Sequence, residues 1–139
     1  MKVDDVYTRN AVVVGPDTSA PEARQLMAEH DVRRLPVVED GKLVGIVTQT
    51  DLLKAAPSPA TSLSIWELNY LLDKIKVAEL MTREVVTTTP DTELQTVAKI
   101  MAERKIGGMP VVEGDRVVGI ITESDVFRAL VKLLEGKQD

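Results

Sequence analysis

The chain has 139 residues, enough for one compact domain or two small halves that share a core, and 44% of them are hydrophobic. Its net charge of −5 argues against non-specific nucleic-acid binding, and the absence of cysteine excludes disulfides, thiolate nucleophiles and cysteine-based metal sites. Residues 1–5 are partly acidic and do not resemble a signal peptide, and no apolar run approaches the roughly 18 residues that span a bilayer. We therefore expect a soluble, cytoplasmic protein without a nucleic-acid or membrane partner.

The two halves of the chain repeat one sequence pattern. Residues 2–55 align with residues 76–129 without a gap. A repeat of this kind predicts two copies of one supersecondary unit, each of which needs the other to bury its apolar face. We expect a single module with a pseudo-twofold axis. Its expected parts are repeat 1 (2–56), an inter-repeat linker with a helix (57–75) and repeat 2 (76–135).

The first strand and first helix of each repeat follow from two successive patterns. The β-branched run at 11–14 predicts a strand. Apolar residues then recur at helical spacing, which predicts a helix that starts with Ser19 and Glu22 as a capping box. In repeat 2, Thr92 and Gln95 are the corresponding capping pair, one position out of register.

Two further strands and a second helix complete each repeat. The dipeptides Asp-Gly at 40–41 and Gly-Asp at 114–115 lie between apolar runs and predict β-hairpins. A helix is expected after Thr48 and again after Thr122, the second one running from about 124 to 135. The predicted fold class is therefore α/β, with two β-α-β-β-α repeats.

The segment between the repeats carries a helix that is apolar on more than one face. Pro57 and Pro59 are expected to end the preceding helix, and a capping box that begins at Ser64 starts the new one. Trp66 and Tyr70 fall outside its main apolar stripe, so the helix needs more than one partner surface. Two interpretations stay open: the helix packs wholly within its own chain, or it presents Trp66 or Tyr70 to a second chain.

A threonine and a carboxylate recur at the junction between strand and helix. Thr48 and Thr122 end apolar strands, and Asp51 and Asp125 follow three residues later in the first helical turn. Such a corner would combine a hydroxyl, a carboxylate and free backbone N–H groups, which suits a sugar and a phosphate. The pattern is also an ordinary helix cap, so a purely structural role stays open, although its double occurrence favours a ligand.

Together these features resemble the CBS domain, and the whole chain resembles a stand-alone tandem CBS pair, or Bateman module. The Pro-Val-Val, hairpin, Val-Gly-Ile and Thr-x-x-Asp features recur in the same order and at constant spacing in both repeats. The resemblance implies two clefts between the repeats that bind adenosine derivatives: AMP, ADP or ATP, or in some members S-adenosylmethionine or NAD. It also implies a regulatory role and a homodimer, and we expect a stand-alone module of this kind to act on an effector protein.

The resemblance assigns roles to individual residues. Asp51 and Asp125 would hold the ribose hydroxyls. The other residues that it implies are the ribose- or phosphate-binding Thr48, Thr50, Thr122 and Ser124, the adenine-pocket Ile46 and Ile120, the phosphate-binding Arg34 with Arg33 as a helper, and, from the first strand of the opposite repeat, Val12 for the second site and Val85 or Val86 for the first. No metal ligand, catalytic residue or obligatory cofactor is implied, and a role for Mg²⁺ beside the nucleotide stays open.

One departure distinguishes the two sites. Where repeat 1 has Arg33 and Arg34, repeat 2 has Gly107 and Gly108. Arginine is a strong phosphate ligand, whereas a glycine pair offers only backbone N–H groups. We predict that the first site prefers phosphorylated ligands and that the second binds more weakly or takes a less charged adenosine compound. The alternative is that both arginines are solvated surface charges.

The sequence offers little to an enzyme. It lacks the usual phosphate-loop, dinucleotide, nucleophile-elbow and zinc-protease motifs, and its one histidine, His30, is expected to be a surface or packing residue. We therefore expect a non-catalytic sensor of adenosine derivatives. The alternatives are a ligand-free dimerisation scaffold, a binder of S-adenosylmethionine or NAD, and an enzyme that acts on an adenosine compound.

Overall fold

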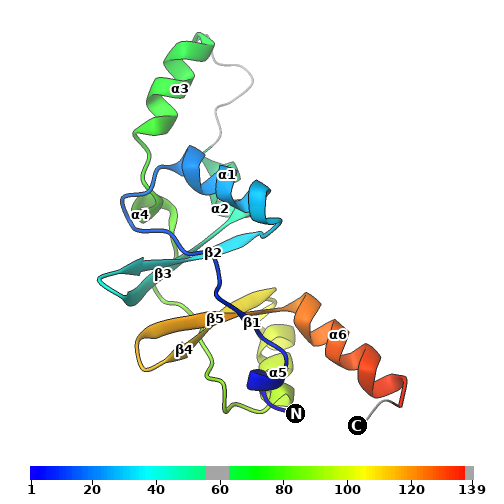
Figure 1. Ribbon diagram of the computed structural model, residues 1–139. Helices are drawn as coiled ribbons and strands as arrows, with labels where there is room; N and C mark the ends of the chain where they lie inside the picture. The colour runs from blue at the N-terminus through cyan, green and yellow to red at the C-terminus, as the bar shows by residue number, and fades with distance from the viewer. Residues whose placement is uncertain (56–62, 137–139) are drawn as a thin grey trace. The chain divides into compact units, whose positions relative to one another are not determined.

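The computed structural model describes residues 1–55 and 63–136, which fold into two compact units (Figure 1). The Asp51 unit comprises Val12–Val85, and the Asp125 unit comprises Met1–Ala11 with Val86–Asp139. The expectation for Pro57 and Pro59 lies outside the described residues. No helix in the described ranges has the length and hydropathy that crossing a membrane requires.

The Asp51 unit contains a β-hairpin covered by helices. Its elements are α1 (Ala20–His30), β2 (Arg34–Glu39), β3 (Lys42–Thr48), α2 (Gln49–Lys54), α3 (Ile65–Asp73) and α4 (Val77–Leu80). Strands β2 and β3 are antiparallel, and the turn residues Asp40 and Gly41 have φ values of 53° and 80°. This confirms the predicted Asp-Gly hairpin. The buried core includes Met27, Leu35 and Val47.

The Asp125 unit has the same plan with one more strand. Its elements are the short 3-10 helix η1 (Val3–Asp5), β1 (Thr8–Arg9), α5 (Leu94–Arg104), β4 (Gly108–Glu113), β5 (Arg116–Thr122) and α6 (Glu123–Leu134). The sheet order is β1-β5-β4. Helix α6 ends within one residue of the predicted bound at about 135, and Gly136, with φ of 73°, follows its C-cap residue.

Each unit takes its outermost segment from the other sequence repeat. In the Asp125 unit, the Val3 N–H donates to the Thr92 carbonyl at 2.9 Å, and β1 pairs with β5. In the Asp51 unit, the Val77 N–H donates to the Thr18 carbonyl at 2.8 Å, and these two residues are the equivalents of Val3 and Thr92 in the 74-residue repeat. The compact units and the sequence repeats therefore have different boundaries.

The glycine of each Val-Gly-Ile segment allows a neighbouring segment of the same unit to lie close to the strand. A Cβ on Gly119 would overlap the carbonyl oxygen of Thr8 and come within 2.5 Å of the Tyr7 ring. A Cβ on Gly45 would lie 2.6 Å from the sulfur of Met81. Both distances are far below van der Waals contact, so the repeated glycine exists for close backbone approach.

The predicted first strand at 11–14 is wrong in extent. Only Val14 has a strand partner: it bridges to Val37 in parallel, its N–H donating to the Pro36 carbonyl at 3.1 Å. The chain passes from one compact unit to the other between Ala11 and Val12. The residues before Val14 therefore do not pair along one neighbouring strand.

The two predicted caps of the first helices have different outcomes. The Ser19 hydroxyl accepts the Glu22 N–H at 3.2 Å, which confirms Ser19 as the cap of α1, but the structure gives no reciprocal bond from the Glu22 side chain to Ser19, both described residues, so the predicted capping box is only half formed. The cap at Thr92 is wrong, because α5 begins at Leu94 with Glu93 as the N-cap residue, and the Thr92 hydroxyl lies 2.9 Å from that of Thr89. The helix therefore starts at the same repeat position in both units.

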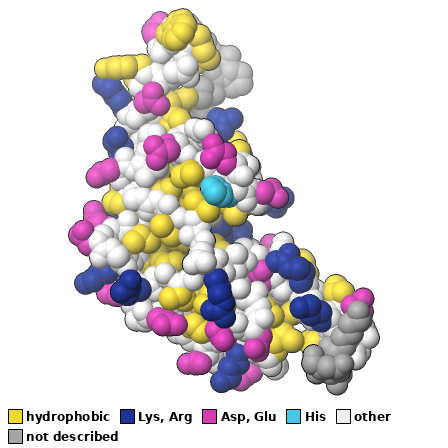
Figure 2. All heavy atoms as spheres, viewed as in Figure 1, with side chains coloured by type: hydrophobic (Ala, Val, Ile, Leu, Met, Phe, Trp, Pro, Cys, Tyr) yellow, Lys and Arg dark blue, Asp and Glu magenta, His cyan; other side chains and the backbone are white. Residues whose placement is uncertain are grey.

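Helix α3 is exposed on its apolar side. Ser64 and Glu67 form the predicted capping box, yet the helix has no buried residue. The side chain of Trp66 is 80% exposed and that of Tyr70 is 61% exposed, and hydrophobic side chains are visible along this helix in Figure 2. The interpretation that the helix packs wholly within its own chain is therefore wrong.

Candidate functional site

The Asp51 corner lies where β3 meets α2. The Thr48 N–H donates to Asp51 Oδ2 at 2.9 Å, and the Asp51 N–H donates to Thr48 Oγ1 at 3.2 Å. This reciprocal pair confirms the capping role. Within the described ranges, the half-buried Asp51 carboxylate accepts no other hydrogen bond, so Oδ1 keeps its capacity to accept one from a ligand hydroxyl.

Strand pairing brings Arg34 to this corner but not Arg33. Arg34 lies opposite Thr48 in the hairpin, and Thr82 bridges to Ile46 from the other side. The alternating residues of β2 and β3 are buried on the helix side, so these four residues share the opposite face of the hairpin. Arg33 instead lines a groove between helices.

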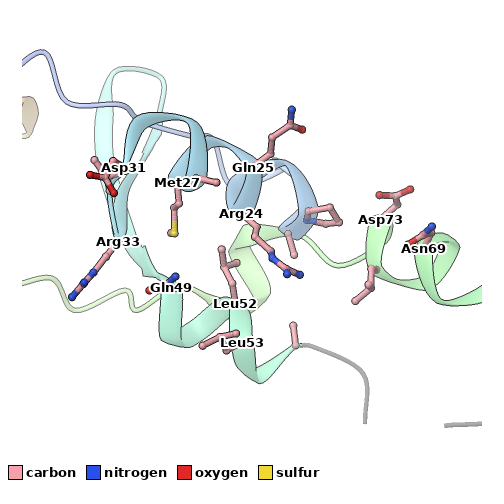
Figure 3. A pocket seen from close by; sticks show the side chains of 16 residues that line it. Arg24, Gln25, Met27, Asp31, Arg33, Gln49, Leu52, Leu53, Asn69 and Asp73 are labelled. Atoms are coloured by element: carbon pink, nitrogen blue, oxygen red, sulfur yellow. The ribbon is translucent and has the colours of Figure 1, made fainter. Parts of the chain in front are cut away.

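That groove is separate from the Asp51 corner. It has a volume of about 900 Å³ and lies among α1, α2 and α3 of the Asp51 unit. Figure 3 shows Arg33 and Gln49 toward one end and Asp73 toward the other. The expected pair of neighbouring phosphate ligands is thus divided between two faces of the unit.

The corners offer fewer free backbone donors than expected. The Gln49 N–H donates to the Arg33 carbonyl at 2.8 Å, and the equivalent Glu123 N–H donates to the Gly107 carbonyl at 3.0 Å. With the Asp51 N–H already bound to Thr48, the expectation of free N–H groups is wrong at these positions. An anion at the Asp51 corner would depend mainly on side chains.

The Asp125 corner, where β5 meets α6, is more enclosed. Asp125 is only 3% exposed, and its Oδ2 accepts the Thr122 N–H at 3.0 Å. The Thr8 hydroxyl donates to Oδ1 at 3.1 Å, and Arg128 Nη2 donates to the same oxygen at 2.6 Å. The same acid that is largely available in the Asp51 corner is therefore surrounded by donors here.

Two residues of this corner were missed by the sequence analysis. Thr8 reaches Asp125 only because β1 pairs with β5, a long-range pairing that no local pattern predicts. Its signal was the return of Thr8 as Thr82 in the repeat. Arg128 was visible as a basic residue three positions after Asp125, a spacing that brings side chains together on a helix.

The remaining predicted residues fall into three groups. Thr50 and Ser124 are exposed in the first turns of α2 and α6. Ile46 is half-buried and Ile120 is buried. Val85 belongs to the same compact unit as Asp51, but Val86, its alternative at the first site, belongs to the other unit. Val12, expected at the second site, also belongs to a different unit from Asp125. The ligand-binding roles of all these residues stay predictions.

The electrostatics of the described residues give no sign of a metal centre. They contain no group of three or more histidine, aspartate or glutamate side chains that could hold a metal ion. His30 is exposed at the end of α1. The pKa of Arg9 is raised, chiefly by its hydrogen bond to Asp4.

Sequence comparison identifies both halves of the chain. The profile of the CBS domain family matches residues 3–58 and 77–132. Uncharacterized protein MJ1225 of Methanocaldococcus jannaschii is 35% identical over 91% of this chain and 46% of its own length. An inosine-5′-monophosphate dehydrogenase of Korarchaeum cryptofilum is 37% identical over 91% of this chain and 24% of its own. The chain thus spans less than half the length of these relatives.

Solved structures resemble the chain over almost its whole length. The CBS domain pair of protein MJ0100, in complex with 5′-methylthioadenosine and S-adenosyl-L-methionine, has a TM-score of 0.77 and 33% identity, covering 99% of this chain and 98% of that one. CBSX2 in complex with AMP has a TM-score of 0.79 and 34% identity, covering 96% of this chain and 98% of that one.

Proposed function

The chain belongs to the CBS domain family, with one domain in each half, and from this we propose that it is a regulatory module that binds adenosine derivatives at the Asp51 and Asp125 corners. The observation that carries the proposal is the Asp51 carboxylate, which is fixed by Thr48, the residue that Arg34 faces across the hairpin, and which retains acceptor capacity within the described ranges. Similar structures contain AMP, or 5′-methylthioadenosine and S-adenosylmethionine.

At the Asp51 corner we propose AMP, ADP or ATP as the ligand. The carboxylate would accept hydrogen bonds from the ribose hydroxyls, because an ionised aspartate has about four acceptor positions. Thr48 and Thr50 would add hydroxyl groups, and Ile46 would contact the adenine. Arg34 would bind phosphate through a charge-assisted hydrogen bond, which is stronger than a neutral one.

At the Asp125 corner we propose a less charged adenosine compound or weaker binding. Gly107 and Gly108 replace the two arginines of repeat 1, so the phosphate side lacks side-chain charge at these positions. An adenosine derivative without phosphate, of the S-adenosylmethionine type, fits this difference. Thr122, Ser124 and Ile120 would take the roles of their repeat 1 counterparts.

The regulatory output would be a shift between conformations rather than a reaction. A ligand changes such an equilibrium only by its differential affinity for the two states. We propose that a second copy of the chain covers the exposed side of α3, including Trp66 and Tyr70, and that an effector protein reads the change. A catalytic role is not part of this proposal, nor is an obligatory cofactor.

Calorimetric titration with AMP, ADP, ATP, S-adenosylmethionine and NAD tests the proposal. The wild type is compared with D51A and D125A, and D17A serves as a control at an exposed aspartate outside both corners. We expect a ligand that D51A or D125A removes and D17A retains. Binding that survives both corner variants would contradict the proposed sites, and no binding at all would contradict the proposal and favour the ligand-free dimerisation scaffold.

A further inference from the structure

The two corners differ most in the hydrogen-bond donors that already contact the aspartate. Resting on the proposed function, we propose that Arg128 is a specificity-determining residue of the second site: its ion pair with Asp125 competes with the hydroxyls of a ribose. We refer to this contact as the Arg128 lock. Because of this contact, the Asp125 corner binds a neutral nucleoside with lower affinity than it would if Arg128 did not contact the carboxylate.

The lock fills an acceptor position that a diol needs. Asp125 Oδ1 accepts from Arg128 at 2.6 Å and from the Thr8 hydroxyl at 3.1 Å. Oδ2 accepts from the Thr122 N–H at 3.0 Å and from the Thr122 hydroxyl at 3.4 Å. Because a carboxylate has about four acceptor positions, this one has none to spare. A ribose must displace a donor that is already present.

The Asp51 corner has no equivalent lock. The residue 74 positions before Arg128 is Lys54, and the structure gives no ion pair between Lys54 and Asp51, which are both described residues. The Asp51 carboxylate accepts from the Thr48 N–H only, within the described ranges. The two sites therefore differ in ribose binding as well as in the phosphate-binding positions.

Arg128 is the donor that can leave. Its side chain is 67% exposed, so water replaces the lost contact when the guanidinium moves away. The Thr122 N–H is fixed by the helix start, and Thr8 is held by the pairing of β1 with β5. Ion pairs between exposed groups change an equilibrium constant by up to about fivefold, and because Asp125 is buried we expect this pair to lie in the upper part of that range, at roughly two- to fivefold. The lock thus sets a modest affinity difference.

The test is calorimetric titration with adenosine, which has the ribose but no phosphate. A D51A background isolates the second site, and R128A is made in it and also in a chain that keeps Asp51, so that a two-site measurement is available if D51A disturbs α2. K132A removes the same charge from an exposed position of the same helix and serves as the matched control. AMP is titrated alongside.

We expect R128A to bind adenosine about two- to fivefold more tightly at the second site, with K132A unchanged. Unchanged or weaker adenosine binding in R128A overturns the lock, and weaker AMP binding at the same time would make Arg128 a phosphate ligand instead. If adenosine or AMP still binds at the Asp51 corner, the proposed function survives that result. If neither compound binds to the wild type or to R128A, the lock and the proposed function fail together.

Discussion

Replacing Thr88 by valine should stabilise the protein. The Thr88 hydroxyl is buried and has no hydrogen-bond partner among the described residues, in a side chain that is 6% exposed. Its backbone is fully engaged: the N–H donates to the Pro110 carbonyl at 3.1 Å, and the carbonyl accepts the Val112 N–H at 2.8 Å. The orphaned group is therefore the side chain alone.

The other repeat shows what a valine does at this position. The equivalent residue of the Asp51 unit is Val14, also 6% exposed, with hydrogen bonds of 3.1 and 2.8 Å to Pro36 and Val38. A valine therefore fits this backbone environment. A buried polar group without a partner costs about 1–3 kcal/mol, so T88V should raise the free energy of unfolding by at least about 1 kcal/mol. For a chain of 139 residues this corresponds to a rise of roughly 3 °C in Tm.

Urea and thermal unfolding followed by circular dichroism measure the effect. V14T is the matched converse and should lower the free energy of unfolding by about 1–3 kcal/mol, since it places a hydroxyl in the same environment. A T88V protein that is no more stable than the wild type would refute the reasoning. It would mean that the hydroxyl gains as much from a bound water as valine gains from burial.

Four further predictions address the corners and the surfaces. Gly119→Ala should lower the free energy of unfolding by about 3 kcal/mol in urea, because the new Cβ overlaps Thr8, whereas the control Gly15→Ala meets only ordinary contacts; equal stabilities would contradict this. Arg34→Ala should weaken AMP binding about tenfold and leave adenosine binding nearly unchanged in calorimetry; full AMP affinity would exclude Arg34 as the phosphate ligand. Lys54→Arg should install a lock at the Asp51 corner and weaken adenosine binding there by roughly two- to fivefold, and no change would count against the lock. Trp66→Ala should shift the sedimentation mass from dimer toward monomer; an unchanged dimer would place the interface elsewhere.

Local features of the fold could be predicted from the sequence because they depend on neighbouring residues. The hairpin at Asp40 and Gly41 needs only two residues with positive φ, and the cap at Thr48 and Asp51 needs only a three-residue spacing. The repeat then transferred each signal to the second half. The helix at Ser64 was predicted for the same local reason.

Long-range pairing could not be predicted in this way. Nothing near Thr8 indicates that it lies beside Ile120 and donates to Asp125 across 117 positions of sequence. The repeat aligned the two copies but could not show that their first segments are exchanged between compact units. The separation of Arg33 from Arg34 follows from the start of β2 at Arg34, because Arg33 lies in the bend before the strand, and no local pattern predicts that bound.

The exchange of segments brings a threonine from the other repeat to each unit, so the differences between the two corners arise from residues of their own repeats, such as Arg128 and Lys54. Each Thr-x-x-Asp motif supplies the cap and the carboxylate, but the outer strand that lies beside it comes from the other repeat. Thr8 therefore acts on Asp125, and Thr82 lies beside Ile46 in the Asp51 unit. A substitution in one repeat can then change the site of the other without altering its own motif. Two sites with separate ligand preferences can arise from one duplicated sequence by changes outside the motif that both share.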